Sequence, residues 1–188
     1  MPAQSRARLL ATLAVPLWLA GCGGIAPTAP PHIDITLIGF NDFHGNLEPP
    51  RLAVPVPAST GASQVPAGGA AYFAGAVATL RAQHPHHLLV SAGDMVGASP
   101  LVSALFLDEP TIHAFNLMGV DFHAPGNHEF DKGWQELLRL QRGGCEKFTV
   151  REPCQSTTPG QSGGFAGAQF PFLTANTLQA DGSTLLPA

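Results

Sequence analysis

Short apolar runs alternate along the chain with stretches whose apolar residues recur at helical spacing. Four runs rich in β-branched and apolar side chains predict strands: residues 33–40, 87–91, 120–124 and 170–176. Four stretches with apolar residues at helical spacing, or with Pro near a first turn, predict helices: residues 69–83, 100–107, 110–118 and 131–141. Strands and helices that alternate in this way indicate an α/β fold.

Two stretches between these elements are ambiguous. Residues 49–69 are rich in Pro, Ala, Gly and Ser without periodicity, and they predict a long loop. His84, His86 and His87 follow the first predicted helix and could bind a metal ion. An exposed turn is the favoured explanation, because Pro85 fixes a turn and no carboxylate or cysteine lies nearby.

Residues 1–22 predict an export signal that lies outside the fold. Arg6 and Arg8 precede an apolar run over residues 9–19, which is too short to span a bilayer comfortably. The run ends in Leu-Ala-Gly-Cys, which resembles the bacterial lipoprotein signal and implies cleavage before Cys22 and lipidation of its thiol. The alternative is an ordinary secretory peptide with an incidental cysteine.

The export signal sets the expected location. Gly23, in place of Asp, favours the outer membrane under the sorting rule for Gram-negative lipoproteins, and residues 23–32 predict a flexible tether. We therefore expect residues 33–188 in the periplasm or at the cell surface, with the membrane contacted through the lipid anchor alone. With Cys22 lipidated, two of the three cysteines remain. In an exported protein this even number favours a disulfide between Cys145 and Cys154, with two free thiols as the alternative.

The composition of the chain indicates a globular domain without a basic surface. Its 188 residues are 45% hydrophobic and 12% charged, and the formal net charge is −4. No run of Lys and Arg occurs beyond the extreme N-terminus, whereas binding to a nucleic-acid backbone needs one. We therefore expect no nucleic-acid polymer as a partner, and no protein partner is evident.

Polar side chains follow three of the apolar runs. Asp42 and His44 follow the first, and strand periodicity would place both on one side, where they could hold one cation. Asp94 follows the second run, and its two oxygens could bridge two cations about 3.5–4 Å apart. The third run leads through a Pro-Gly turn to Asn127 and His128, with a carboxylate three residues further on.

Each of these residues also has a structural explanation. Asp131 could cap a helix, Asp94 could cap a turn, and His44 could be a partly buried histidine. These explanations do not account for all three motifs together, because the motifs occur in order, each after an apolar run. We therefore favour a metal site.

The ordered motifs resemble the calcineurin-like metallophosphoesterase superfamily. Residues 41–45, Asn-Asp-Phe-His-Gly, and residues 126–131, Gly-Asn-His-Glu-Phe-Asp, look most like its bacterial 5′-nucleotidase branch. The resemblance covers residues 33 to about 178 and implies an α/β/β/α sandwich with two divalent metal ions. Ligands of mixed type suit Zn²⁺, Mn²⁺, Fe or Co²⁺. The resemblance also implies hydrolysis of a phosphoester by a metal-activated water.

The resemblance assigns a role to each motif residue. Asp42 and His44 would ligate the first metal ion, Asp94 would bridge, and Asn127 would ligate the second ion and touch the phosphate. His128 would stabilise charge on the phosphoryl group or the leaving oxygen, and its orientation would be fixed by the carboxylate of Asp131.

The resemblance is incomplete at the C-terminal side. Those enzymes need further histidine ligands downstream, and none follows His128. We therefore expect residues 33–188 to be the first half of the sandwich, the N-terminal part of a longer enzyme, and inactive alone. The expected enzyme is a 5′-nucleotidase that acts on nucleotides outside the cytoplasm. Cyclic-nucleotide phosphodiesterases and UDP-sugar hydrolases share the motifs and stay open, as does a non-catalytic surface lipoprotein.

Overall fold

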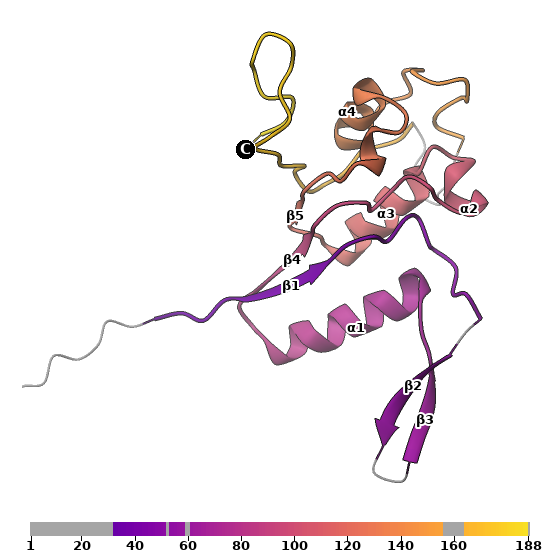
Figure 1. Ribbon diagram of the computed structural model, residues 1–188, viewed down its shortest axis with the longest axis vertical. Helices are drawn as coiled ribbons and strands as arrows, with labels where there is room; N and C mark the ends of the chain where they lie inside the picture. Colours follow the sequence, from indigo (N-terminus) through magenta and orange to yellow (C-terminus); the bar gives the residue numbers. More distant parts are fainter. Residues whose placement is uncertain (1–31, 52, 59–60, 156–163, 188) are drawn as a thin grey trace, which may run out of the picture. The chain divides into compact units, whose positions relative to one another are not determined.

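Three parallel strands form the centre of the fold in the computed structural model (Figure 1). They are β1 (Thr36–Phe40), β4 (His87–Ser91) and β5 (Phe122–His123), in the order β1-β4-β5. Phe40 pairs with Ser91 and Ser91 pairs with His123, so the carboxyl ends of all three strands lie at one edge. Loops that leave this edge are well placed to share a site.

The structure describes residues 32–51, 53–58, 61–155 and 164–187. The predicted signal sequence and Cys22 lie outside these residues, as does most of the predicted tether. Ile33–Ala188 forms one compact unit. Within the described part of the chain, no helix is both long and apolar enough to cross a membrane.

The helices follow the predicted order. They are α1 (Gly69–Gln83), α2 (Leu101–Ala104), α3 (Glu109–Met118), a 3-10 turn η1 (His128–Phe130) and α4 (Trp134–Arg142). Aromatic rings join the first strand to α1 and α3. Phe40 stacks on Phe115 with ring centroids 5.0 Å apart and meets Phe73 edge-on at 4.9 Å. Contact of the buried Phe115 with the partly buried Phe40 and Phe73 packs the end of β1 against both helices.

Residues 49–69 contain a hairpin where the sequence predicted a loop. Strand β2 (Ala53–Ala58) pairs antiparallel with β3 (Gly61–Pro66) in a separate two-stranded sheet. Pro55 and Pro57 lie within β2. Proline cannot donate to a ladder, but each strand of a two-stranded ribbon has an unpaired side on which a missing N–H is harmless. The predicted loop was wrong because a two-stranded ribbon needs neither a periodic apolar face nor an N–H at every position.

The predicted strand over residues 170–176 is reduced to one bridge. Phe172 bridges His123 in parallel, so this segment does lie beside β5. The N–H of His123 donates to the carbonyl of Pro171, and the N–H of Leu173 donates to the carbonyl of His123. The N–H of Phe172 faces away from β5 and donates to the side chain of Gln141. Pro171 has no N–H with which to continue the ladder toward the N-terminus.

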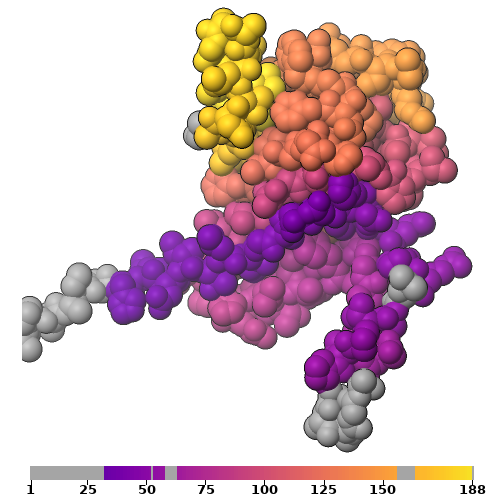
Figure 2. All heavy atoms as spheres, in the orientation of Figure 1, coloured from indigo at the N-terminus to yellow at the C-terminus, as the bar shows by residue number. Residues whose placement is uncertain are grey.

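One face of β1 is covered and the other is open. Ile38 is 7% exposed, whereas its neighbour Leu37 is 65% exposed and Ile35 is 63% exposed. Figure 2 shows the indigo segment that carries β1 running along the surface of the molecule. Parallel sheets are normally covered on both faces. The open apolar face is consistent with the first half of a sandwich.

The segment after α4 is held by a disulfide and by buried charges. Cys145 and Cys154 are joined, which confirms the predicted disulfide. Arg139 pairs with Glu109 and Glu136, each with an N–O distance of 2.7 Å. All three charged side chains are at most 3% exposed. This group was not predicted from the sequence, because residue type alone does not distinguish buried charges from exposed ones.

Candidate metal centre

Backbone hydrogen bonds join the loops that follow β1 and β4. The N–H of Asp42 donates to the carbonyl of Gly93 at 3.0 Å, and the N–H of His44 donates to the carbonyl of Asp94 at 2.9 Å. The N–H of His128, from the loop after β5, donates to the carboxylate of Asp94 at 3.0 Å. The three sequence motifs are therefore held together at the carboxyl edge of the sheet.

Three side chains from these loops converge. His44, Asp94 and His128 each offer one donor atom, and these atoms lie within 4.8 Å of one another. The two imidazole rings meet edge-on with centroids 5.0 Å apart. Imidazole nitrogen and carboxylate oxygen are the donors that divalent transition metals prefer. This cluster is the candidate metal centre.

His44 is oriented for metal binding by its second nitrogen. Its Nδ1 lies 2.9 Å from the carbonyl oxygen of Gly97, so Nδ1 carries the proton and donates. The lone pair is then on Nε2, 3.6 Å from the Oδ1 of Asp42. Two ligands about 2.1 Å from one ion lie about 3–3.5 Å apart. The Asp42 and His44 side chains therefore fit a shared divalent ion.

The backbone at the site is in an uncommon conformation. Asp42, His44 and Asp94 have φ angles of 54°, 47° and 53°. The left-handed region disfavours side chains other than glycine by roughly 1–2 kcal/mol per residue. The argument from strand periodicity for Asp42 and His44 was therefore wrong: β1 ends at Phe40, and a left-handed turn brings the two side chains together. Strain at a cluster of ligand-type residues is typical of functional sites.

Two glycines allow the loops to approach. A Cβ added at Gly126 would lie 2.7 Å from the backbone nitrogen of Asp94 and would overlap its carboxylate. A Cβ added at Gly97 would lie 2.5 Å from the carbonyl oxygen of His128. Any side chain at either position would push Asp94 and His128 apart.

Asn127 lies beside this cluster but is exposed, at the start of η1. Asp131 ends η1, and α4 begins only after Gly133, so Asp131 is not the helix cap that the sequence offered as an alternative. Its Oδ2 lies 2.8 Å from Nδ1 of His128. That hydrogen bond raises the pKa of the His128 imidazole, and the charges of Asp131 and Asp94 add to the increase against a smaller effect of burial.

We predict that Asp131→Asn lowers the pKa of His128 in the metal-free chain. The raised pKa means that the ring keeps its proton to higher pH, and a neutral amide removes the charge that favours the imidazolium. An NMR titration of the His128 ring protons measures the change. Asp121→Asn is the control, because Asp121 accepts from the N–H of Leu89 instead. An unchanged His128 titration in Asp131→Asn would contradict the assigned pairing.

Sequence analysis missed one residue of the site. Glu129 is 3% exposed and accepts hydrogen bonds from four backbone N–H groups. Burial tends to raise the pKa of this carboxyl, but His123 and the accepted hydrogen bonds hold it below its ordinary value. The signal was present in the sequence, because Glu129 follows directly after Asn127 and His128 within the motif.

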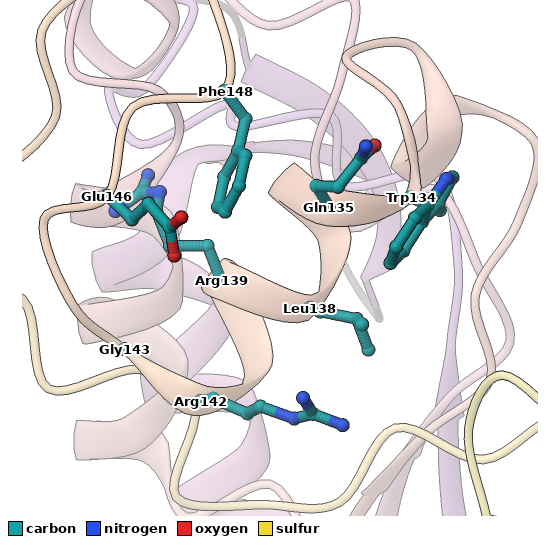
Figure 3. Close-up of a pocket in the computed structure, with 8 residues that line it drawn as sticks. All are labelled: Trp134, Gln135, Leu138, Arg139, Arg142, Gly143, Glu146 and Phe148. Carbon is teal, nitrogen blue, oxygen red and sulfur yellow. The ribbon is translucent and has the colours of Figure 1, made fainter.

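Two other features lie apart from the candidate ligands. Among the described residues, the histidines at 84–87 do not form a metal-ligating group, and Nδ1 of His87 lies 2.7 Å from the carbonyl oxygen of His84, as in a turn. A pocket of about 280 Å³ lies beside α4, and Figure 3 shows the residues that line it. Its lining includes no candidate metal ligand: Trp134, Gln135, Leu138, Arg139, Arg142, Gly143, Glu146 and Phe148.

Comparisons with known proteins place the chain among named relatives, although no family model matches. An uncharacterized protein in the pqq-V 5′ region of Acinetobacter calcoaceticus is 46% identical, over 94% of this chain and 89% of that protein. Endonuclease YhcR of Bacillus subtilis is 33% identical, over 86% of this chain and 12% of that protein. A probable 5′-nucleotidase of Treponema pallidum is 34% identical, over 69% of this chain and 21% of that protein.

A solved structure shares the fold. The calcineurin-like phosphoesterase YfkN of Bacillus subtilis matches with a TM-score of 0.52 and 21% identity, over 81% of this chain and 40% of that chain. This match agrees with the α/β architecture expected from the sequence. The chain spans 89% of the Acinetobacter protein but only 21% of the Treponema relative and 12% of the Bacillus relative.

Proposed function

The chain belongs to the 5′-nucleotidase-like metallophosphoesterases, and on that premise we propose that it supplies part of the metal centre of an exported nucleotide phosphohydrolase. The observation that carries this proposal is the convergence of His44, Asp94 and His128 at the carboxyl edge of the sheet. The activity of the whole protein is part of the proposal, because the chain covers only 21% of the named nucleotidase.

The ligands are proposed from donor chemistry and position. Asp42 and His44 would hold one divalent ion, Asp94 would be shared with a second, and Asn127 would contribute to the second. When bound, such ions would supply a lower pKa for a bound water and positive charge against the phosphoryl oxygens. The tautomer of His44, fixed by its hydrogen bond to Gly97, supports its place in this set.

His128 is proposed to act on the substrate and not as a metal ligand. Its Nδ1 is engaged by Asp131, which leaves Nε2 as the nitrogen that can reach a ligand. The hydrogen bond to Asp131 also raises the pKa of the ring, and an imidazolium can donate from Nε2 to a phosphoryl or leaving oxygen. Asp131 orients the ring and stabilises its charge.

The substrate is proposed to be a nucleoside 5′-monophosphate. The Treponema relative named as a probable 5′-nucleotidase supports this choice. Cyclic-nucleotide and UDP-sugar hydrolysis remain alternatives that use the same motif residues. The relative named as an endonuclease favours a further candidate, hydrolysis of a phosphodiester.

Export is proposed from the N-terminal segment, with Cys22 as the lipidated residue of an outer-membrane lipoprotein. The disulfide between Cys145 and Cys154 supports an oxidising compartment. Residues 33–188 are proposed as the catalytic part, preceded by a tether over residues 23–32.

The test uses the protein encoded by the whole open reading frame, assayed with Mn²⁺, Zn²⁺ or Co²⁺. We expect phosphate release from 5′-AMP, and we expect EDTA to abolish it. UDP-glucose, 2′,3′-cyclic AMP and bis(p-nitrophenyl) phosphate are tested in parallel. Hydrolysis of a diester without hydrolysis of 5′-AMP would replace the nucleotidase proposal. Metal binding without any hydrolysis would leave a non-catalytic lipoprotein as the better explanation.

A further inference from the structure

A buried carboxylate joins two loops of the candidate metal centre. Oε1 of Glu129 accepts from the N–H of Met95 at 2.8 Å and from that of Val96 at 3.2 Å. Its Oε2 accepts from the N–H of Asp94 at 3.0 Å and from that of Gly126 at 2.5 Å. One side chain thus fixes three consecutive residues of the loop after β4 against the turn after β5.

The buried carboxylate of Glu129 is stabilised by the groups around it. A buried carboxylate needs hydrogen bonds or an opposite charge, and four N–H donors supply the first. The Nε2 of His123 also lies 3.4 Å from Oε1 of Glu129, although not in hydrogen-bond geometry. The ring of His123 is itself held edge-on to Phe172, with centroids 4.6 Å apart.

These contacts determine the position of Asp94. Its backbone has a φ of 53°, which the loop does not favour by itself. Glu129 holds the N–H of Asp94 on one side, and the carboxylate of Asp94 accepts the N–H of His128 at 3.0 Å on the other. His128 and Glu129 are adjacent in the loop after β5. That loop therefore both donates a hydrogen bond to Asp94, from the N–H of His128, and accepts one from the N–H of Asp94, at Glu129.

We propose that Glu129 is a positioning residue of the metal centre, which sets the carboxylate of Asp94 relative to His44 and His128. This inference rests on the proposed function, since Glu129 contributes through the backbone of Asp94 and is not itself one of the clustered side chains. It adds a role to a residue that sequence analysis did not include among the site residues.

Glutamine is the informative substitution. It has nearly the shape of glutamate but offers one acceptor oxygen and one NH₂ group. In Glu129→Gln the NH₂ group would face two backbone N–H donors, so the 94–96 loop or the turn at Gly126 must shift. Glu129→Asp keeps both acceptor oxygens and the charge, but its side chain is one methylene shorter.

The test is titration of the full chain with Co²⁺, followed by calorimetry and by the visible absorption of the bound ion. We expect Glu129→Gln to weaken Co²⁺ binding about 10–100-fold and to change the absorption spectrum, as loss of a group that orients a ligand does. We expect Glu129→Asp to recover part of the affinity and of the spectrum. It also keeps the inference testable if Glu129→Gln does not fold.

Glu136→Gln is the matched control. Glu136 is 1% exposed and pairs with Arg139, away from the cluster, so its loss should lower the melting temperature and leave Co²⁺ affinity unchanged. Wild-type affinity and spectrum in folded Glu129→Gln would overturn the inference, as would equal losses of affinity in Glu129→Gln and Glu136→Gln. Failure of the wild-type chain to bind Co²⁺ would instead refute the proposed function, and this inference with it.

Discussion

Replacement of Arg139 by methionine is expected to lower the free energy of unfolding by about 3–5 kcal/mol. The guanidinium is buried and is shared by Glu109 and Glu136, each 2.7 Å away. Methionine fills a similar volume but leaves two buried carboxylates without a cation. Because a domain has only about 5–15 kcal/mol of stability, this loss is a large part of the total.

The effect should extend beyond α4. Arg139 also donates to the carbonyl of Gly144 at 3.0 Å and lies 5.1 Å from the centroid of the Phe165 ring. Glu109 accepts the N–H of Cys154 at 2.8 Å. Loss of the cation therefore loosens both ends of the segment that the disulfide closes, and hydrogen exchange should become faster at the amide of Cys154.

Urea unfolding of the full chain measures the loss. Arg142→Met is the control, since Arg142 lies on the same helix, is exposed, and undergoes the same change of side chain. Its effect should stay within about 0.5 kcal/mol. A difference below about 1 kcal/mol between the two variants would show that the buried charges do not stabilise the fold as argued.

The sequence predicted the elements that carry strong local patterns. The helix over residues 69–83 and the strand over residues 87–91 have the predicted bounds, because periodicity and flanking turn residues agree there. The meeting of His44, Asp94 and His128 was also predictable, because each follows an apolar run and parallel strands end at one edge.

The rest depended on contacts that are distant in sequence. Whether Glu129 is exposed or bound by four N–H groups is decided by a loop more than thirty residues away, at Asp94. The acceptor for the N–H of Phe172 is likewise supplied by Gln141, on another element. The left-handed backbone at Asp42 and His44 could not be predicted from residue type, because neither position is a glycine. Local patterns contain none of these facts.

Asp94→Asn is expected to have the largest effect on metal binding. Asparagine is nearly the same size, tolerates the left-handed conformation at φ 53°, and keeps an oxygen to accept the N–H of His128. The fold should therefore persist. What is lost is the negative charge and the second oxygen through which Asp94 would bridge two ions.

We expect the affinity for Co²⁺ to fall about 100-fold or more, because loss of a residue that only orients a ligand already lowers affinity about 10–100-fold. Asp121→Asn, which changes the carboxylate bound by the N–H of Leu89, should leave Co²⁺ affinity unchanged. The loss of Co²⁺ affinity should be larger in Asp94→Asn than in Glu129→Gln. A ligand contacts the ion directly, whereas a positioning residue acts only through the ligand that it orients. The reverse order would mean that Glu129, and not Asp94, contacts the ion, and the assignment of both residues would have to be exchanged.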